Sequence, residues 1–469
     1  MTRVVFLVCV HFFFFFSFAL GRQESDIVSS EDSKVVVPLS TESVLLPLYI
    51  APLFVEDSEF DAMYHRQLEE VLRFDFAHNG RTQLVSSTKE REDQAAKERF
   101  NGYYDRMAWR NLSILYVVKI QIRGKNLSAG VFSIRDYNVK SITGISLSGN
   151  ISIDRRQIHQ LVDCIHKEFF DCGGIAGTRL LYALKTREKN RDSSKWVSEI
   201  WECDCDGANA RRLTYEKGFC VTPAYLPPKE GYASGNFFYV SYRLGQPKIF
   251  VASFRERVGR RFSYLRGNQL MPAVSSDQNS VAFICDVGGN PDLFLQPYHP
   301  KAGCIGKPRQ IFASPRGAQA SPSFSPDGKR LAFVSDKDGA PRIYVLNVPA
   351  SGSKSESVNP ILITKCNREN TCPVWSPDGK KLAYSSMTYG VRQIWIYDFV
   401  KQEESQLTHG GYYHRENPSW APNGLHIVFN AGNESVSELY IVNLNQPEAV
   451  KISSGEGEKR FPCWEPRLE

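Results

Sequence analysis

The residues of this sequence with the clearest potential for chemistry are two histidines and an acidic turn. His159 and His166 lie seven residues apart in a segment with helical periodicity, so both lie on one face of the predicted helix. A metal site would need a third ligand, and helical histidine pairs that bind zinc are more usually spaced i, i+4. We therefore interpret both as surface or half-buried helix residues. The run 204–207, Asp-Cys-Asp-Gly, resembles the start of a calcium loop but lacks the later acidic ligands, so we expect a hairpin turn.

Nucleophilic catalysis has little support in the sequence. In some serine hydrolases a β-propeller precedes the catalytic domain, but such an enzyme would need a Gly-x-Ser-x-Gly elbow, and the run 144–149 has the wrong spacing for one. The 11 cysteines show no Cys-x-x-Cys pair, which argues against a structural zinc site. We expect no catalytic residue, no metal and no cofactor.

Disulfides are a separate possibility, because an exported chain can form them. The candidate pairs lie close in sequence: Cys366 with Cys372, Cys285 with Cys304, and Cys203 or Cys205 with Cys220.

A sequence pattern repeats along the second half of the chain and predicts the scaffold that carries any binding residues. Residues 322–335 read Pro-Ser-Phe-Ser-Pro-Asp-Gly-Lys followed by an apolar strand, and 373–386 and 418–430 repeat the pattern. Pro326 presets φ, Asp327 bonds its own backbone and Gly328 suits φ > 0, so each repeat predicts a strand, a tight turn and a strand. Looser copies begin at Pro223 and Pro272, with spacings of 44 to 51 residues, which is typical of propeller blades.

The last repeat is truncated at 462–466, shortly before the chain ends, while 178–184 begins a repeat without the proline opening. We expect the C-terminal strand to pair with 179–184 and close a six-bladed β-propeller, which leaves no open sheet edge.

The N-terminal part of the sequence lacks the repeat, and its composition changes along the chain in a way that predicts the order of the domains. Residues 1–21, with Arg3 before an apolar run, are expected to be a signal peptide, an uncleaved anchor being the alternative. Residues 22–44 are expected to be flexible, 45–172 to form a small α/β domain and 173–469 to form the propeller. Within the α/β domain we predict helices at 57–74, 93–109 and 154–170, the last ended by Gly173-Gly174. The predicted strands are 114–122, 130–134 and 139–147, with an edge strand in 44–53.

This order of features resembles the TolB family of bacterial envelope proteins. The specific elements are Trp109 and Leu112 before the 114–122 strand, the Gly173-Gly174 junction, and the ending Phe-Pro-Cys-Trp-Glu-Pro at 461–466. The resemblance implies a periplasmic scaffold of the Tol-Pal system that supports outer-membrane integrity and cell division, without catalysis. It also implies two partners: the lipoprotein Pal at the propeller, and a TolA-like inner-membrane protein at the mature N-terminus.

Partner contacts are expected at one end of the central channel that a closed propeller encloses. In a four-stranded blade, the residues before each repeat-opening proline lie on the same face as the connection between strands two and three, and loops on rigid scaffolds commonly bind partners. We expect Met271 to be an apolar anchor and Arg415 a charged rim residue. The full predicted set is Asn268, Met271, Gln319, Arg415, Asn417 and Arg460, with Gln319 and Asn417 as hydrogen bonders.

Two other hypotheses stay open. A propeller enzyme or carbohydrate-binding protein would use the central channel, and carboxylates converging at one mouth would favour it. A structural envelope protein that depends on metal or disulfides is the third hypothesis. The net charge of +6 is mild for this length, and the arginine-rich run 255–261 has no aromatic platform, which argues against nucleic-acid binding.

Overall fold

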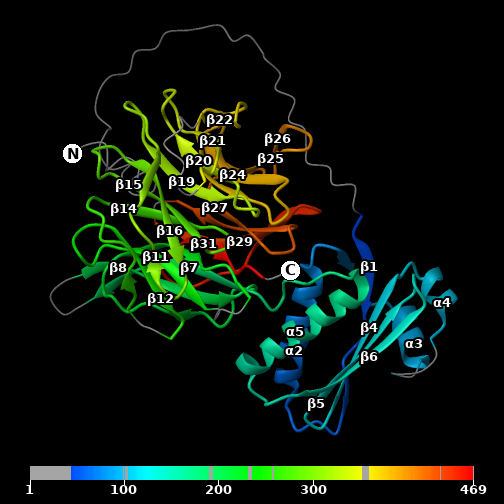
Figure 1. The fold of residues 1–469 in the computed structure, drawn as a ribbon. Coiled ribbons are helices and arrows are strands. Elements are labelled where there is room, and N and C mark those ends of the chain that lie inside the picture. The colour runs from blue at the N-terminus through cyan, green and yellow to red at the C-terminus, as the bar shows by residue number, and fades with distance from the viewer. Residues whose placement is uncertain are drawn as a thin grey trace.

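A computed structural model describes residues 44–98, 100, 104–189, 194–230, 235–255, 258–350, 359–433 and 435–467. The predicted signal peptide and residues 22–43 lie outside this range. The described chain forms an α/β domain followed by a β-propeller, as the sequence predicts (Figure 1).

The α/β domain is built on a six-stranded sheet. Its strand order is β3-β1-β4-β5-β6, and β2 also pairs with β4. The strands are β1 (Leu46–Ile50), β2 (Phe54–Glu56), β3 (Thr82–Leu84), β4 (Tyr116–Arg123), β5 (Asn126–Ser133) and β6 (Asn138–Ser146). The expectation of an edge strand at 44–53 is wrong, because β1 pairs in parallel with β3 on one side and β4 on the other.

The described residues of this domain form four helices: α2 (Ala62–Ala77), α3 (Lys89–Lys97), α4 (Arg106–Asn111) and α5 (Ile151–Phe170). The predicted helix 93–109 is therefore two helices, each with its own N-cap, Thr88 and Asp105. The end of α5 also differs from the prediction: Asp171, at φ 53°, takes the left-handed position before the glycines are reached. None of the described helices is long and apolar enough to cross a membrane.

The two faces of the sheet carry separate cores. Helices α2 and α5 lie between the sheet and the propeller, whereas α3 and α4 lie on the other side (Figure 1). Leu68 and Val71 of α2 and Ile158 of α5 are buried against the first face. Trp109 of α4 is fully buried on the second face, next to Tyr49. This sandwich fixes the helical face that meets the propeller.

The propeller strands fall into groups that each begin at an inner strand. Successive inner strands contact one another around the centre. The inner strands are β10 (Cys220–Tyr225), β14 (Gln269–Val274), β19 (Gln319–Phe324), β23 (Asn370–Trp375), β27 (His414–Trp420) and β31 (Glu458–Trp464). The second strands are β7 (Arg179–Lys189), β11 (Asn236–Ser241), β15 (Ser280–Cys285), β20 (Arg330–Ser335), β24 (Lys381–Thr388) and β28 (His426–Gly432).

The third and outer strands complete the groups. The third strands are β8 (Ser194–Asp204), β12 (Lys248–Ser253), β16 (Asp292–His299), β21 (Arg342–Asn347), β25 (Val391–Asp398) and β29 (Ser437–Asn443). The outer strands are β9 (Arg211–Arg212), β13 (Arg260–Arg261), β17 (Gly303–Cys304), β18 (Arg309–Phe312), β22 (Ile361–Leu362), β26 (Glu403–Gln406) and β30 (Gln446–Lys451). Four groups form separate sheets. The other two share one eight-stranded sheet through a single parallel pair between Ser437 and Glu458.

The ends of the propeller sequence meet in that shared sheet. Strand β31 pairs antiparallel with β7, placing Cys463 opposite Leu181 and Trp464 opposite Leu180. This confirms the predicted pairing of the C-terminal strand with 179–184. The inner strand of the first group therefore comes from the end of the chain.

The tight turn of the repeats forms as its residue types predict. In the turn at 325–328, Gly328 has φ 69° and its N–H donates to the Ser325 carbonyl over 2.8 Å. The Asp327 carboxylate accepts from the Lys329 N–H at 3.1 Å. The acidic run 204–207 is likewise a turn between β8 and β9, as expected, with the Gly207 N–H donating to Asp204 over 2.9 Å.

Every inner strand is bulged at its proline. The register shifts at this point in all six inner strands. The residue before each proline has a left-handed backbone, which is uncommon for a residue with a side chain. These residues are Thr222, Met271, Ser321, Cys372, Asn417 and Phe461, with φ between 47° and 55°.

Candidate functional site

The two faces of the propeller are occupied differently. The α/β domain meets the turns that join first to second strands and third to fourth strands: Asn445 donates to Gly80 O at 2.8 Å, and Arg155 pairs with Asp206 at 2.6 Å. A side chain at Gly80 would lie 2.6 Å from His426, so this contact requires glycine. We call the opposite face, made by the other connections, the open face.

The open face concentrates exposed apolar and aromatic side chains. Tyr412 is 96% exposed, Tyr389 89% and Tyr264 83%. Further exposed side chains in the same set of connections, or in the hairpin ends beside them, are Trp196, Tyr215, Leu244, Val287, Tyr413 and Val436. Tyrosine and tryptophan are enriched in the energetically dominant parts of protein interfaces, so this face has the composition of a protein-binding surface.

The bulge residues form a connected series within the channel, near the ends of the inner strands that meet the open face. The Ser321 N–H lies 3.2 Å from Met271 Sδ, and Ser321 Oγ lies 3.9 Å from Cys372 Sγ. The Cys372 thiol donates to Asn417 Oδ1 at 3.2 Å. Burial raises the pKa of Cys372 to about 11, so the thiol stays neutral at neutral pH and is a poor nucleophile.

Four of the six predicted contact residues retain some exposure at or near this mouth. Asn268 precedes β14 and bonds Asp286 through both its backbone and side-chain amide. Met271 is half-buried against the cores of neighbouring groups. Arg460 donates to Glu458 at 3.1 Å. Arg415 donates to His409 O at 3.0 Å, and burial lowers the pKa of its guanidinium, although arginine remains charged at neutral pH.

Gln319 and Asn417 lie deeper than expected. Gln319 has no exposed surface, because it points between strands and accepts from Ser335 at 2.8 Å. Asn417 is buried and donates to Asn430 at 2.8 Å, and Asn430 in turn accepts from the Phe461 N–H. Both amides support the bulges from within rather than present hydrogen-bonding groups to a partner.

The histidine interpretation is wrong. His159 and His166 are each 1% exposed, because the propeller covers the face of α5 on which they lie. His159 lies between Asp75 of α2 and Asp206 of the β8–β9 turn. Each of these three residues has one nitrogen or oxygen atom that could ligate a metal ion, and these three atoms all lie within 4.8 Å of one another. The sequence could not reveal this group, because its members come from three separate elements and two domains.

The predicted disulfides are not formed. All ten cysteines of the described chain, from Cys164 to Cys463, have free thiols. In the candidate pair Cys285 and Cys304, each thiol donates instead to a backbone carbonyl, that of Arg266 or Phe262.

Comparison with known proteins agrees with this architecture. The family model described as the TolB beta propeller domain matches residues 170–468. A Protein TolB homolog from Protochlamydia amoebophila is 46% identical over 382 residues, which is 81% of each chain. The chain belongs to the TolB family. It is therefore a β-propeller protein of the Tol-Pal system.

Other TolB relatives extend the likeness. The Protein TolB homolog of Chlamydia pneumoniae is 35% identical over 325 residues, 69% of this chain and 73% of the relative. The crystal structure of TolB from Acinetobacter baumannii shares the fold, with a TM-score of 0.69 at 20% identity over 92% of this chain and 98% of that one. The TolB fold thus extends over both the α/β domain and the propeller.

Proposed function

We propose that this TolB-family chain is a periplasmic scaffold whose open propeller face binds the lipoprotein Pal. In this proposal the mature N-terminus engages a TolA-like inner-membrane protein, and the two contacts support outer-membrane integrity and cell division. The observation that supports it best is the concentration of exposed aromatic side chains on the open face, away from the docked α/β domain. Exposed apolar patches rimmed by polar groups mark interaction sites.

Binding is favoured over catalysis by the pairing of the carboxylates in this part of the propeller. Glu199 accepts from Arg212 at 2.6 Å, and Glu216 accepts from Arg243 at 2.9 Å. Glu416 lies 3.4 Å from Arg392. Carboxylates held in ion pairs with arginine support the neighbouring strands and loops, and their oxygens are not free to take part in general acid or base chemistry. We therefore propose no enzymatic activity.

The mouth of the channel can be tested directly with Pal. Replacing Met271 by Asp and Arg415 by Glu is expected to weaken Pal binding about tenfold or more, because an apolar anchor and a cation are both lost. Since Met271 also packs against the propeller core, a second variant carries Tyr389→Ala and Tyr412→Ala, which remove only exposed rings. Isothermal titration calorimetry gives the affinities, and circular dichroism checks the fold.

The matched control is Val400→Ala, which truncates a 74% exposed side chain in the β25–β26 turn on the face opposite to the open one. This variant should bind Pal like the parent chain. Unchanged Pal affinity in both well-folded double variants would exclude the open face as the binding site.

A further inference from the structure

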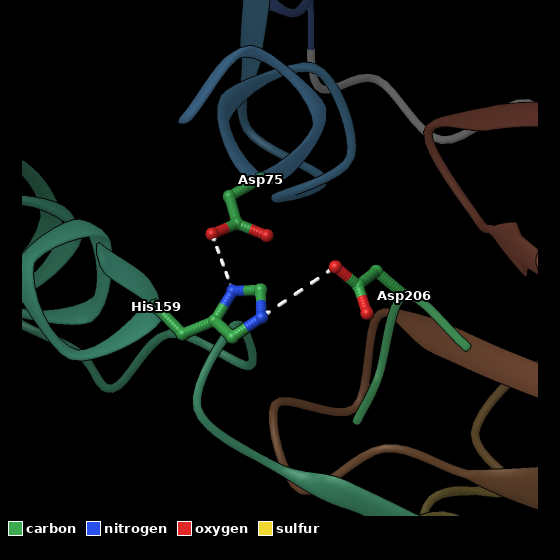
Figure 2. Close-up of side chains that lie close together, drawn as sticks. All are labelled: Asp75, His159 and Asp206. Atoms are coloured by element: carbon green, nitrogen blue, oxygen red, sulfur yellow. Dashed lines mark hydrogen bonds and ion pairs between the residues drawn. The ribbon is translucent and has the colours of Figure 1, made fainter. Parts of the chain in front are cut away.

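His159 of α5 links three elements at the boundary of the two domains. Its Nδ1 lies 2.7 Å from Asp75 Oδ2 on α2, and its Nε2 lies 3.5 Å from Asp206 Oδ2 on the β8–β9 turn (Figure 2). Asp75 and His159 belong to the α/β domain, whereas Asp206 belongs to the propeller. All three side chains are at most 2% exposed. The imidazole therefore joins a contact within one domain to a contact between domains.

The charge of this group depends on one proton. Two buried carboxylates, Asp75 and Asp206, face His159, and Arg155 pairs with Asp206 through Nε at 2.9 Å and Nη2 at 2.6 Å. With His159 protonated, the two negative charges are balanced by two positive charges. With His159 neutral, the group holds one uncompensated negative charge, which is costly in a buried site.

The hydrogen-bonding geometry makes the contact between domains the sensitive one. A neutral His159 can keep its Nδ1–H bond to Asp75, and its Nε2 then presents a lone pair to the Asp206 carboxylate. A lone pair facing an anion repels it, whereas an Nε2–H attracts it. Loss of the proton thus changes the sign of the link to the propeller and leaves the α2–α5 contact in place.

We propose that His159 is a proton-operated latch between the α/β domain and the propeller. The protonated imidazole holds the turn at 204–210 against α5, and release of the proton to solvent loosens that turn. The latch goes beyond partner binding and does not depend on which partner the open face takes. It gives the chain a way to change how its two domains are held together.

The pKa of His159 acts in the same direction. Burial opposes the charge of His159, but the hydrogen bond and charge of Asp75 outweigh it, and the pKa of His159 is raised above its ordinary value. Burial raises the pKa of Asp75 to about 6, so this carboxylate carries its charge only above that pH. The raised histidine pKa means that the proton of His159 is fully bound below the ordinary value of 6.5 and is lost as pH rises through the folded value.

Other charged groups around the latch keep their own partners. Asp204, at the end of β8, accepts from Asn209 at 2.7 Å. Asp163, one turn further along α5, accepts from the Ala176 N–H at 2.8 Å and pairs with Arg467 at 2.9 Å. The neighbouring Cys205 thiol donates to Ala176 O, and burial raises its pKa well above the ordinary value, so it stays neutral. None of these groups replaces the proton on His159.

A divalent cation is the rival occupant, because the donor types suit one. However, Arg155 bonds the same Asp206 oxygen that faces His159, and the Nδ1 of His159 carries the hydrogen donated to Asp75, so it has no lone pair to offer a cation. A cation would have to displace or repel the guanidinium. A proton fits this arrangement without any displacement.

Hydrogen–deuterium exchange of the mature full chain tests the latch. Protection of the turn at 204–210 is measured at about pH 6 and about pH 9, with correction for intrinsic exchange. In the parent chain this protection should fall about tenfold between the two pH values, because a hydrogen bond to a charged group is typically worth at least one tenfold step in an equilibrium constant. His159→Gln, which cannot titrate, should show low protection at both pH values.

Two further variants keep the test decisive. Asp206→Asn leaves the α2–α5 contact intact and should also abolish the pH response, which covers the case in which His159→Gln does not fold. Arg155→Gln is the control: it removes an ion pair with Asp206 that does not include His159, and it should lower protection while keeping the tenfold response. Two results would overturn the latch. One is protection of the turn in the parent chain that does not change with pH. The other is a pH-dependent fall in His159→Gln or Asp206→Asn as large as that of the parent chain. Zinc chloride raising protection of the turn in the parent chain but not in His159→Gln would overturn it in favour of a metal site.

Discussion

Trp464, in the last strand, donates its indole N–H to the hydroxyl of Thr178, 286 residues earlier in the chain, over 2.8 Å. The indole is 3% exposed and packs among the strands of the last and first groups. Thr178 stands directly before β7, whose antiparallel partner is β31. A single buried side chain therefore joins the end of the propeller to its beginning.

Truncation after Glu458 should lower the melting temperature by about 10 °C or more and promote aggregation. The cut removes Trp464, whose loss alone is worth about 3–5 kcal/mol in a core, and it exposes the edge of β7. Each kcal/mol shifts the melting temperature of a large domain by about 2–4 °C. Differential scanning calorimetry measures the effect. A chain ending after Arg467 is the control, and equal melting of both chains would disprove closure by β31.

Deleting residues 22–34 should leave the melting temperature unchanged and abolish binding to a TolA-like partner. This segment lies outside the described residues, and the prediction rests on its composition: only Ile27 and Val28 are strongly apolar among polar and acidic residues, too few to form a core. Calorimetry and a pull-down with purified TolA check the two halves of the prediction. A clear fall in melting temperature would show instead that the segment is part of the fold.

Thr222→Gly should stabilise the chain by about 1 kcal/mol. Thr222 is β-branched at φ 47°, and its buried hydroxyl has no hydrogen-bond partner within the described chain. A left-handed backbone costs about 1–2 kcal/mol for such a residue, which outweighs the entropy cost of glycine. Denaturant unfolding gives the difference. Val221→Gly, one residue earlier in the same strand, should be destabilising, and a similar loss for both variants would show that the bulge is not strained.

Acid should lower the stability of the folded chain through His426. This residue is 1% exposed, and burial lowers its pKa to about 3. The unfolded chain binds the proton near pH 6.5 whereas the folded chain does not, so stability falls as pH drops below about 6.5, by about 2 kcal/mol at pH 5. His426→Gln should show a shallower fall in melting temperature between about pH 7 and about pH 5. Burial also lowers the pKa of His78 and His166, so part of the slope should remain. An unchanged slope would mean that His426 does not contribute.

Local chemistry explains which features the sequence predicts well. The turn at 325–328 forms as expected, because Pro326, Asp327 and Gly328 each supply a backbone preference that acts within four residues. The spacing of the prolines likewise predicts the propeller, and the truncated last repeat predicts that β31 pairs with β7. Helix α5 follows from its apolar periodicity, with bounds close to those expected.

Only the tertiary structure decides what the faces of these elements meet. The pattern on α5 shows where His159 points, but not that a propeller turn covers that face and brings Asp206 to 3.5 Å. Glutamine is usually an exposed, hydrogen-bonding residue, yet the pairing of neighbouring strands places Gln319 in the interior beside Ser335. Backbone preferences act over a few residues and are encoded locally. Burial and charge depend on segments far apart in the chain, whose positions are set only when the whole fold has closed.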